Sequence, residues 1–89
     1  MDRYTVHIIT PERVEFEGDI ESLTAPGQDG YFGILAHHAP LLANLESGTL
    51  TIRESTFSQR SWEIDGGFLE VHPEGVIVLV RHLQANAVV

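Results

Sequence analysis

The sequence predicts an all-β domain, a sandwich or a barrel, and two features of its apolar pattern indicate this class. Apolar and polar residues alternate with period two along several short segments, most clearly over 4–9, 49–53 and 62–65. Residues that favour turns separate these segments at intervals of roughly eight to twelve residues. No segment shows the helical period, and 39–45, the one helical candidate, is equally compatible with a short strand.

The first half of the chain divides into strands at dipeptides that favour turns. Residues 4–9 form the first expected strand, with Tyr4, Val6 and Ile8 on one face. Two shorter strands are expected over 14–17 and 20–25. The turns that end these strands are predicted at Thr10-Pro11, Gly18-Asp19 and Pro26-Gly27.

The second half contains a strong hairpin signal, Asp65-Gly66-Gly67, because both glycines adopt positive φ without steric cost. Residues 68–71 form the strand expected after it, and Pro73-Glu74-Gly75 predicts another tight turn. Residues 76–80, VIVLV, are apolar on both faces. A strand of a half-exposed sheet alternates, so this segment indicates a central strand or one whose outer face is covered.

Length and composition exclude several classes of function. The 89 residues are expected to form one domain, 1–89, with a modest core and little room for a deep catalytic cleft. Thirteen acidic residues against five arginines give a net charge of −8, which disfavours binding to nucleic acid or to anionic lipid. The absence of cysteine excludes disulfides, thiolate catalysis and cysteine-bound zinc. We expect neither a signal peptide nor a membrane helix, which would need roughly 18 apolar residues in a row.

The adjacent histidines His37 and His38 raise the question of a metal site. On an extended strand their side chains would point to opposite faces and could not bind the same ion. Zinc requires three or four convergent ligands, and the remaining histidines, His7, His72 and His82, lack the spacing of a ligand set. We therefore expect histidines of a loop or an interface, and no metal.

Other residues that could carry chemistry fit structural roles better. The acids of segment 12–21 are expected on a solvated strand edge, where charge discourages pairing between molecules. The glycines of 27–33 follow the spacing GxxGxxG, which is neither the dinucleotide fingerprint nor the P-loop. No serine lies in the GxSxG elbow of a hydrolase. The sequence thus predicts no catalytic residue and no cofactor.

Apolar residues are concentrated in the segment 31–45, beyond what a core of this size requires. Some of them are expected to fill the core, and the rest to form an exposed patch of the kind that marks a protein–protein contact. Because the surface is acidic, a partner should offer basic or apolar surface. The residues concerned are Tyr31, Phe32, Ile34, Leu35, Pro40, Leu41, Leu42 and Leu45.

Three long motifs resemble the amino-terminal domain of the epsilon subunit of F-type ATP synthase. They are ITPERVEFEGDIESLTAPGQDGYFGIL, HAPLLANLESGTLTIR and DGGFLEVHPEGVIVLV, and the resemblance covers about residues 5–80. It implies a flattened, jelly-roll-like sandwich of two antiparallel sheets with about ten short strands. It also implies a non-catalytic subunit of the central stalk, present as one copy, which binds the gamma subunit and the rotor ring and couples ion translocation to ATP synthesis.

The resemblance assigns the two contacts to different segments of this chain. The loop that faces the rotor ring would comprise Gly27, Gln28, Asp29, Gly30, Tyr31 and Phe32. The gamma-subunit interface would comprise Thr10, His38, Ala39, Pro40, Leu42 and Ala43. The implied location is the cytoplasmic face of the bacterial inner membrane, reached only through the complex, with the stromal face of plastid thylakoids as the alternative.

The sequence departs from the family pattern at three places. The family often has Pro-Gly where this chain has Ala36-His37, so His38 is the family histidine and His37 is a local substitution. Tyr31 occupies a position where an acid is common. Family members usually continue into a helical hairpin, which this sequence does not contain. If residues 1–89 are the natural subunit, inhibition of hydrolysis by such a hairpin is expected to be absent, whereas a truncated chain would imply nothing about regulation.

Two further classes of function remain as alternatives. One is a small jelly-roll metalloenzyme that uses His37, His38 and His72. The other is a free-standing regulatory module that uses the same sandwich for an unrelated partner, because a fold alone does not fix a function.

Overall fold

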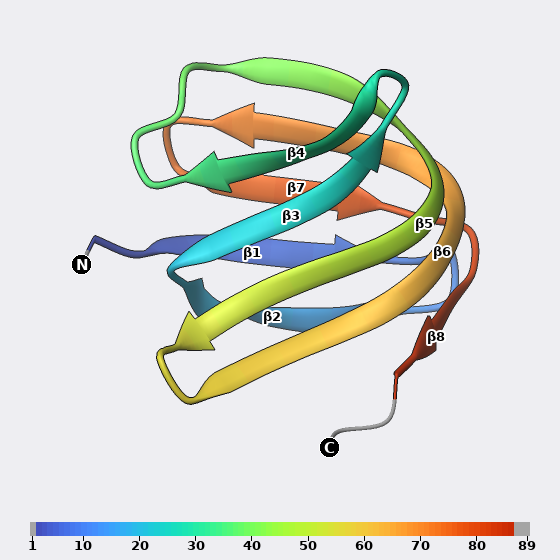
Figure 1. The fold of residues 1–89 in the computed structure, drawn as a ribbon, viewed down its shortest axis with the longest axis horizontal. Helices are drawn as coiled ribbons and strands as arrows, with labels where there is room; N and C mark the ends of the chain where they lie inside the picture. The colour runs from blue at the N-terminus through green and yellow to red at the C-terminus, as the bar shows by residue number, and fades with distance from the viewer. Residues whose placement is uncertain (1, 87–89) are drawn as a thin grey trace.

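The computed structural model describes residues 2–86, which contain eight β-strands joined by turns and loops, and no helix (Figure 1). The all-β prediction is therefore confirmed. The strands are β1 (Tyr4–Ile9), β2 (Val14–Ile20), β3 (Ser22–Gly27), β4 (Gly30–Leu35), β5 (Leu41–Ser55), β6 (Ser58–His72), β7 (Gly75–Leu79) and β8 (Leu83–Ala85).

The strands form one mixed sheet in the order β2-β1-β7-β6-β5-β3-β4, with β8 paired to β6. Neighbouring strands are antiparallel except β1 and β7, which are parallel. The sheet is therefore mixed, whereas purely antiparallel sheets were expected. The long strands β5 and β6 curve around one side of the molecule and carry the sheet from one layer to the other (Figure 1). The result is a sandwich folded from a single sheet.

β5 and β6 explain why fewer and longer strands are found than the about ten expected. Each contains 15 residues, and their first and second halves belong to different layers. The pairing of β5 with β6 runs from Leu41↔Val71 to Leu45↔Gly67 and then from Ser47↔Asp65 onwards, so both strands bend together near Glu46. A strand that serves both layers replaces two short ones.

The predicted hairpin turn at Asp65-Gly66-Gly67 is wrong, because these residues lie inside β6. Both glycines do adopt positive φ, 125° and 152°, but they bend the strand instead of reversing it. A side chain on Gly67 would collide with the carbonyl oxygen of Leu79 on the neighbouring strand β7. Glycine is therefore required here for close approach between strands at the bend.

Two other predicted turns also lie within strands. Gly18-Asp19 belongs to β2, and Pro26-Gly27 ends β3, which places the actual turns at Glu21 and at Gln28-Asp29. The turns at Thr10-Pro11 and Pro73-Glu74 are confirmed. Residues 75–79 form β7, which lies between β1 and β6 as the apolar pattern of a central strand predicts.

The core fills the space between the two layers. Strands β1 to β7 contribute buried side chains to it, and Leu83 of β8 packs against its edge. A T-shaped contact between Phe16 and Trp62, with ring centroids 5.9 Å apart, joins β2 to β6. Burial of this apolar surface is the main force that holds the layers together. The fully buried large side chains are Ile8, Ile20, Leu23, Ile34, Leu50, Ile52, Leu69, Val6, Val76 and Val78.

Candidate protein-docking surfaces

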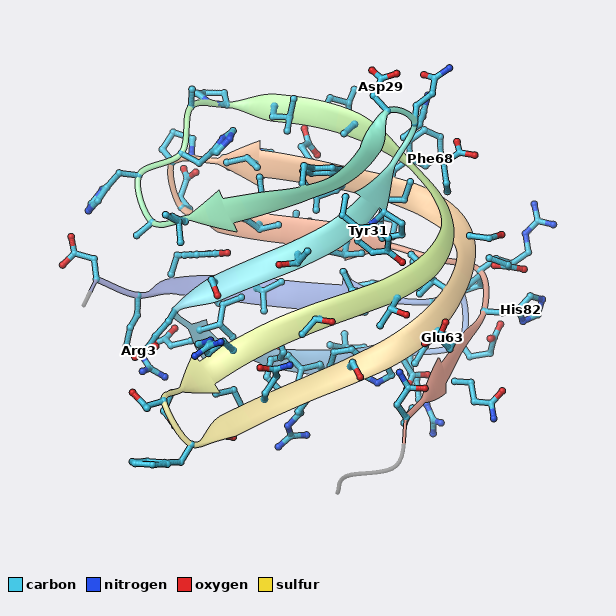
Figure 2. The ribbon with its side chains drawn as sticks, viewed as in Figure 1. Arg3, Asp29, Tyr31, Glu63, Phe68 and His82 are labelled. Carbon is cyan, nitrogen blue, oxygen red and sulfur yellow. The ribbon has the colours of Figure 1, made fainter. Side chains whose placement is uncertain are left out.

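The segment predicted to face a rotor ring is the tip of the hairpin between β3 and β4. Gly27 pairs with Gly30, and Gln28 and Asp29 form the exposed turn between them. Figure 2 shows Asp29 at the outer end of this hairpin. Phe32 is half-buried and packs against the core, so it supports the hairpin from inside. The exposed part of the predicted loop is therefore 28–31.

Tyr31 is exposed but held in place. Its side chain is 59% exposed, and its hydroxyl oxygen accepts a hydrogen bond from the backbone N–H of Thr49 on β5, with 2.9 Å between nitrogen and oxygen. A polar group that is anchored in this way has a defined position on the surface. Tyr31 is thus largely exposed while its hydroxyl is bonded to β5.

The segment His38–Asn44 lies beside this hairpin. The tip of the hairpin and the residues His38, Leu41, Leu42, Ala43 and Asn44 line one shallow depression. The structure therefore brings the predicted ring-facing loop together with three of the six predicted gamma-facing residues, His38, Leu42 and Ala43. Ala39 and Pro40 are also exposed, in the loop that leads into β5.

Leu42 and Ala43 lie on opposite faces of β5. Leu42 is 70% exposed, whereas Ala43 pairs with Leu69, which is fully buried. Cross-strand partners share a face of the sheet, so Ala43 lies on the core side and Leu42 on the outer side. Of these two predicted contact residues, Leu42 is the exposed one, and Ala43 is half-buried at the edge of the depression.

Thr10 lies at a second depression, at the end of β1. It is 6% exposed, and its hydroxyl bonds to the backbone of Arg13 in the turn that follows. The depression is lined by Thr10, Asn44, Phe68 and Leu79 among others. Thr10 therefore shapes this surface through the turn that it stabilises, and its own side chain is covered.

Phe68 and Leu79 are two exposed apolar residues that the sequence analysis did not assign to a contact. Phe68 pairs with Leu79 on one side and with Asn44 on the other, so all three lie on the outer face. Asn44 lines both depressions, which joins them into one continuous surface. The alternation of Phe68 with buried Leu69 was the only signal in the sequence for this exposure.

The histidines do not assemble into a metal site. His37, His38 and His72 surround one depression, but among residues 2–86 no group of three histidines, acids or cysteines converges on a point that could hold an ion. His37 instead contacts Asp2 at 2.8 Å, and Nδ1 of His38 lies 2.7 Å from the carbonyl oxygen of Ala39. A third contact, at 3.2 Å, joins His72 to Glu70.

The acids of segment 12–21 lie mainly on β2, which is an edge strand of the sheet. Arg13 pairs with Glu15 at 3.0 Å, and His7 on β1 lies 3.5 Å from Glu17. This arrangement fits the predicted charged edge, which discourages pairing with another sheet. None of residues 2–86 forms a helix able to cross a membrane.

A carboxylate on the outer face of β6 connects the carboxy-terminal strand to the sandwich. One oxygen of Glu63 accepts hydrogen bonds from the Thr49 hydroxyl at 2.7 Å and from the side-chain amide of Asn86 at 3.0 Å. Both hydrogen bonds lower the pKa of Glu63, and the bond from Asn86 has the larger effect. Glu63 thus links β5, β6 and the residue that follows β8 (Figure 2).

The described residues thus form a β-sandwich with two adjoining candidate docking surfaces, an exposed hairpin tip and a partly apolar outer sheet face. Residues 3–85 match the family described as ATP synthase, Delta/Epsilon chain, beta-sandwich domain. The chain belongs to this family.

Curated relatives agree with this assignment. The ATP synthase epsilon chain of Caulobacter vibrioides is 39% identical over 75 residues, which are 84% of this chain and 86% of that protein. The epsilon chain of Chlorobium limicola is 43% identical over 88% of this chain and 89% of its own length. The chain spans 62% of the epsilon chain of Leptospira borgpetersenii, with 40% identity.

Solved structures share the fold at lower identity. A chain of the Euglena gracilis mitochondrial ATP synthase, in a structure of OSCP, F1 and c-ring, matches with a TM-score of 0.87 and 18% identity. That match covers 93% of this chain and 53% of the other. A chain of the Tetrahymena thermophila central stalk and c-ring matches with a TM-score of 0.79, 23% identity and coverage of 92% and 66%.

Proposed function

We propose that this chain is a non-catalytic subunit of the rotating central stalk of an F-type ATP synthase. In this role it binds the gamma subunit and the rotor ring, and it helps to couple ion translocation to ATP synthesis. The observation that carries the proposal is the family match over residues 3–85, together with relatives named epsilon chain that are about 40% identical. Catalysis would belong to other subunits of the complex.

The hairpin tip is proposed to contact the rotor ring. Its exposed residues, 28–31, project from the end of the β3–β4 pair and carry an acid, an amide and an anchored phenol. Hydrogen-bonding groups of this kind suit polar loops. Phe32 and Gly27 belong to this contact as its support, because Phe32 packs beneath the tip.

The gamma subunit is proposed to bind the apolar outer face beside the hairpin. Leu42 is 70% exposed, and the exposed residues His38, Ala39 and Pro40 precede it along the same segment. Ala43 and Thr10 would contribute by shaping the surface, since Ala43 lies on the core side and Thr10 is buried. A partner with apolar or basic residues fits this face, because the chain carries a net charge of −8.

Torque transmission follows from the stiffness of the sandwich. β5 begins at Leu41, next to Leu42 of the proposed gamma face, and continues through the bend into the other layer. A load applied at either surface is therefore carried by a continuous strand and by the close-packed core. The mechanism needs no reacting group in this chain.

The ATP synthase complex is associated with a membrane. This subunit would reach the membrane only through its partners in the complex. We place it on the cytoplasmic face of the bacterial inner membrane. The curated relatives from Caulobacter, Chlorobium and Leptospira, which are bacteria, support this placement over a plastid.

Affinity purification from gently solubilised membranes of the source organism tests the proposed function. The tagged chain should recover the gamma, alpha, beta and ring subunits, identified by mass spectrometry. Recovery of none of them from an extract that contains intact ATP synthase would contradict the proposal.

A further inference from the structure

The side chain of Tyr31 connects two strands that do not pair with each other. Tyr31 lies on the edge strand β4, directly opposite Pro26 on β3. Its hydroxyl reaches past β3 to the backbone N–H of Thr49 on β5. The hairpin is thus joined to β5 by a side-chain bond in addition to the β3–β5 pairing (Figure 2).

This bond lies where the β3–β5 pairing is interrupted. The register runs from Ser22↔Arg53 to Thr24↔Thr51, shifts, and resumes only at Gly27↔Leu45. If the first register continued, Pro26 would stand opposite Thr49. Proline has no N–H and cannot complete a pair of backbone hydrogen bonds. The Tyr31 hydroxyl provides an acceptor for Thr49 at this gap.

Gly48 makes room for the phenol. A β-carbon on Gly48 would lie 2.6 Å from the Tyr31 hydroxyl oxygen and 2.8 Å from the β-carbon of Pro26. Distances this short exclude a side chain at position 48. The hydroxyl of Tyr31 therefore rests on bare backbone, between Pro26 and Gly48, which fixes it next to the Thr49 nitrogen.

We propose that Tyr31 is a positioning residue that anchors the hairpin tip, 26–32, to β5. Within the described sheet β4 pairs only with β3, and the interruption of the β3–β5 ladder near the hairpin tip weakens the connection of this hairpin to β5. The added bond resists sliding of β4 along the sheet. The consequence for the rotor ring depends on the proposed function, whereas the anchor itself does not.

The anchor is tested in the 89-residue chain by amide hydrogen exchange, followed residue by residue with NMR. Tyr31→Phe removes the hydroxyl and keeps the ring. The Thr49 amide should then exchange roughly fivefold to tenfold faster, the change expected for loss of one neutral hydrogen bond. The amides of Leu50 and Ile52, in the same strand, should keep their rates.

Tyr4→Phe is the matched control, because the Tyr4 hydroxyl donates to the carbonyl of Ile34 on β4, away from the hairpin tip. It should leave Thr49 exchange unchanged. An unchanged Thr49 rate in Tyr31→Phe would overturn the anchor. An equal increase at Leu50 and Ile52 would overturn it too, since that pattern reports general destabilisation.

The second readout is the affinity of the assembled stalk for the rotor ring and its ATP-driven ion pumping. Tyr31→Phe should weaken ring binding severalfold, and Tyr4→Phe should not. Faster Thr49 exchange with normal ring binding would overturn the positioning role while the anchor stands. If the unchanged chain does not bind the ring at all, the proposed function fails, and the exchange result decides the anchor alone.

Discussion

Phe68 on β6 lies directly opposite Leu79 on β7, and the two side chains remain 52% and 46% exposed on the outer face of the sheet. A cross-strand apolar pair stabilises a sheet by roughly 0.2–1 kcal/mol. The two side chains line one depression together with Thr10 and Asn44. An exposed apolar patch of this kind usually marks a protein–protein contact. This pair would extend the proposed gamma-facing surface from Asn44 toward Thr10.

Removing the pair should weaken assembly more than folding. Phe68→Ala and Leu79→Ala should each lower the free energy of unfolding by no more than about 1 kcal/mol, because both side chains are half exposed. Each should weaken binding to the gamma subunit by roughly tenfold, and the double variant should show coupling between the two sites. Urea denaturation and titration with purified gamma subunit measure the two effects. Phe57→Ala, at the tip of the β5–β6 hairpin and 98% exposed, is the control and should change neither.

A charged residue at position 42 should mainly weaken binding to the gamma subunit, whereas one at position 43 should mainly lower the stability of the fold. Leu42→Glu places a carboxylate on the exposed face, so the free energy of unfolding should change by less than about 0.5 kcal/mol. Binding to gamma should weaken by about 2 kcal/mol, or roughly thirtyfold, because an unpaired charge enters an apolar contact.

Ala43→Glu, in contrast, places its charge on the core side opposite Leu69. It should lower the free energy of unfolding by about 3 kcal/mol. Thermal unfolding of both variants separates the two residues. Equal stability of Leu42→Glu and Ala43→Glu would show that the assignment of these faces is wrong.

Acid should release the carboxy-terminal strand. Hydrogen bonds from Asn86 and Thr49 stabilise the ionised carboxylate and lower the pKa of Glu63 in the folded state. A lowered folded pKa gives stability that is fully present above the unfolded pKa and is lost as the pH falls through the folded pKa. The pairing of β8 with β6 should therefore loosen below the ordinary titration range of glutamate.

An NMR titration of the Glu63 carboxyl carbon measures this effect directly. Asn86→Ala removes the largest cause and should raise the pKa of Glu63, and Thr49→Val should raise it less. Thr24→Val, an exposed threonine on β3, provides the control. A pKa of Glu63 that stays constant in Asn86→Ala would contradict the hydrogen-bond assignment.

Gly67→Ala should destabilise the bend of β6. The new methyl group would meet the Leu79 carbonyl, and φ at this residue is 152°. We expect the free energy of unfolding to fall by about 2 kcal/mol or more, since the neighbouring strand must move. Gly33→Ala is the matched control, because its β-carbon would meet only the Leu23 carbonyl at 3.7 Å, an ordinary contact. Chemical denaturation of the two variants should differ clearly, and similar midpoints would show that the bend tolerates a side chain.

The sequence by itself determined the all-β class, the position of β1 and of the central strand β7, and part of the core. Alternation over 4–9 predicted β1 with Val6 and Ile8 buried, and the two-faced run 76–80 predicted the central position of β7. These features follow from the period of a strand and from burial, both of which are local properties. The three motifs over about residues 9–80 also led to the family that residues 3–85 match.

Only the tertiary structure decided what the turn-forming residues do. Asp65-Gly66-Gly67 has the composition of a hairpin turn, yet it bends a continuous strand because the carbonyl of Leu79 occupies the space beside Gly67. In the same way, the acceptor for Thr49 comes from Tyr31, eighteen positions away, because the β3–β5 register shifts past Pro26. Local sequence cannot specify which strand stands beside a glycine or a proline, and that neighbour determines whether the chain turns, bends or needs an anchor.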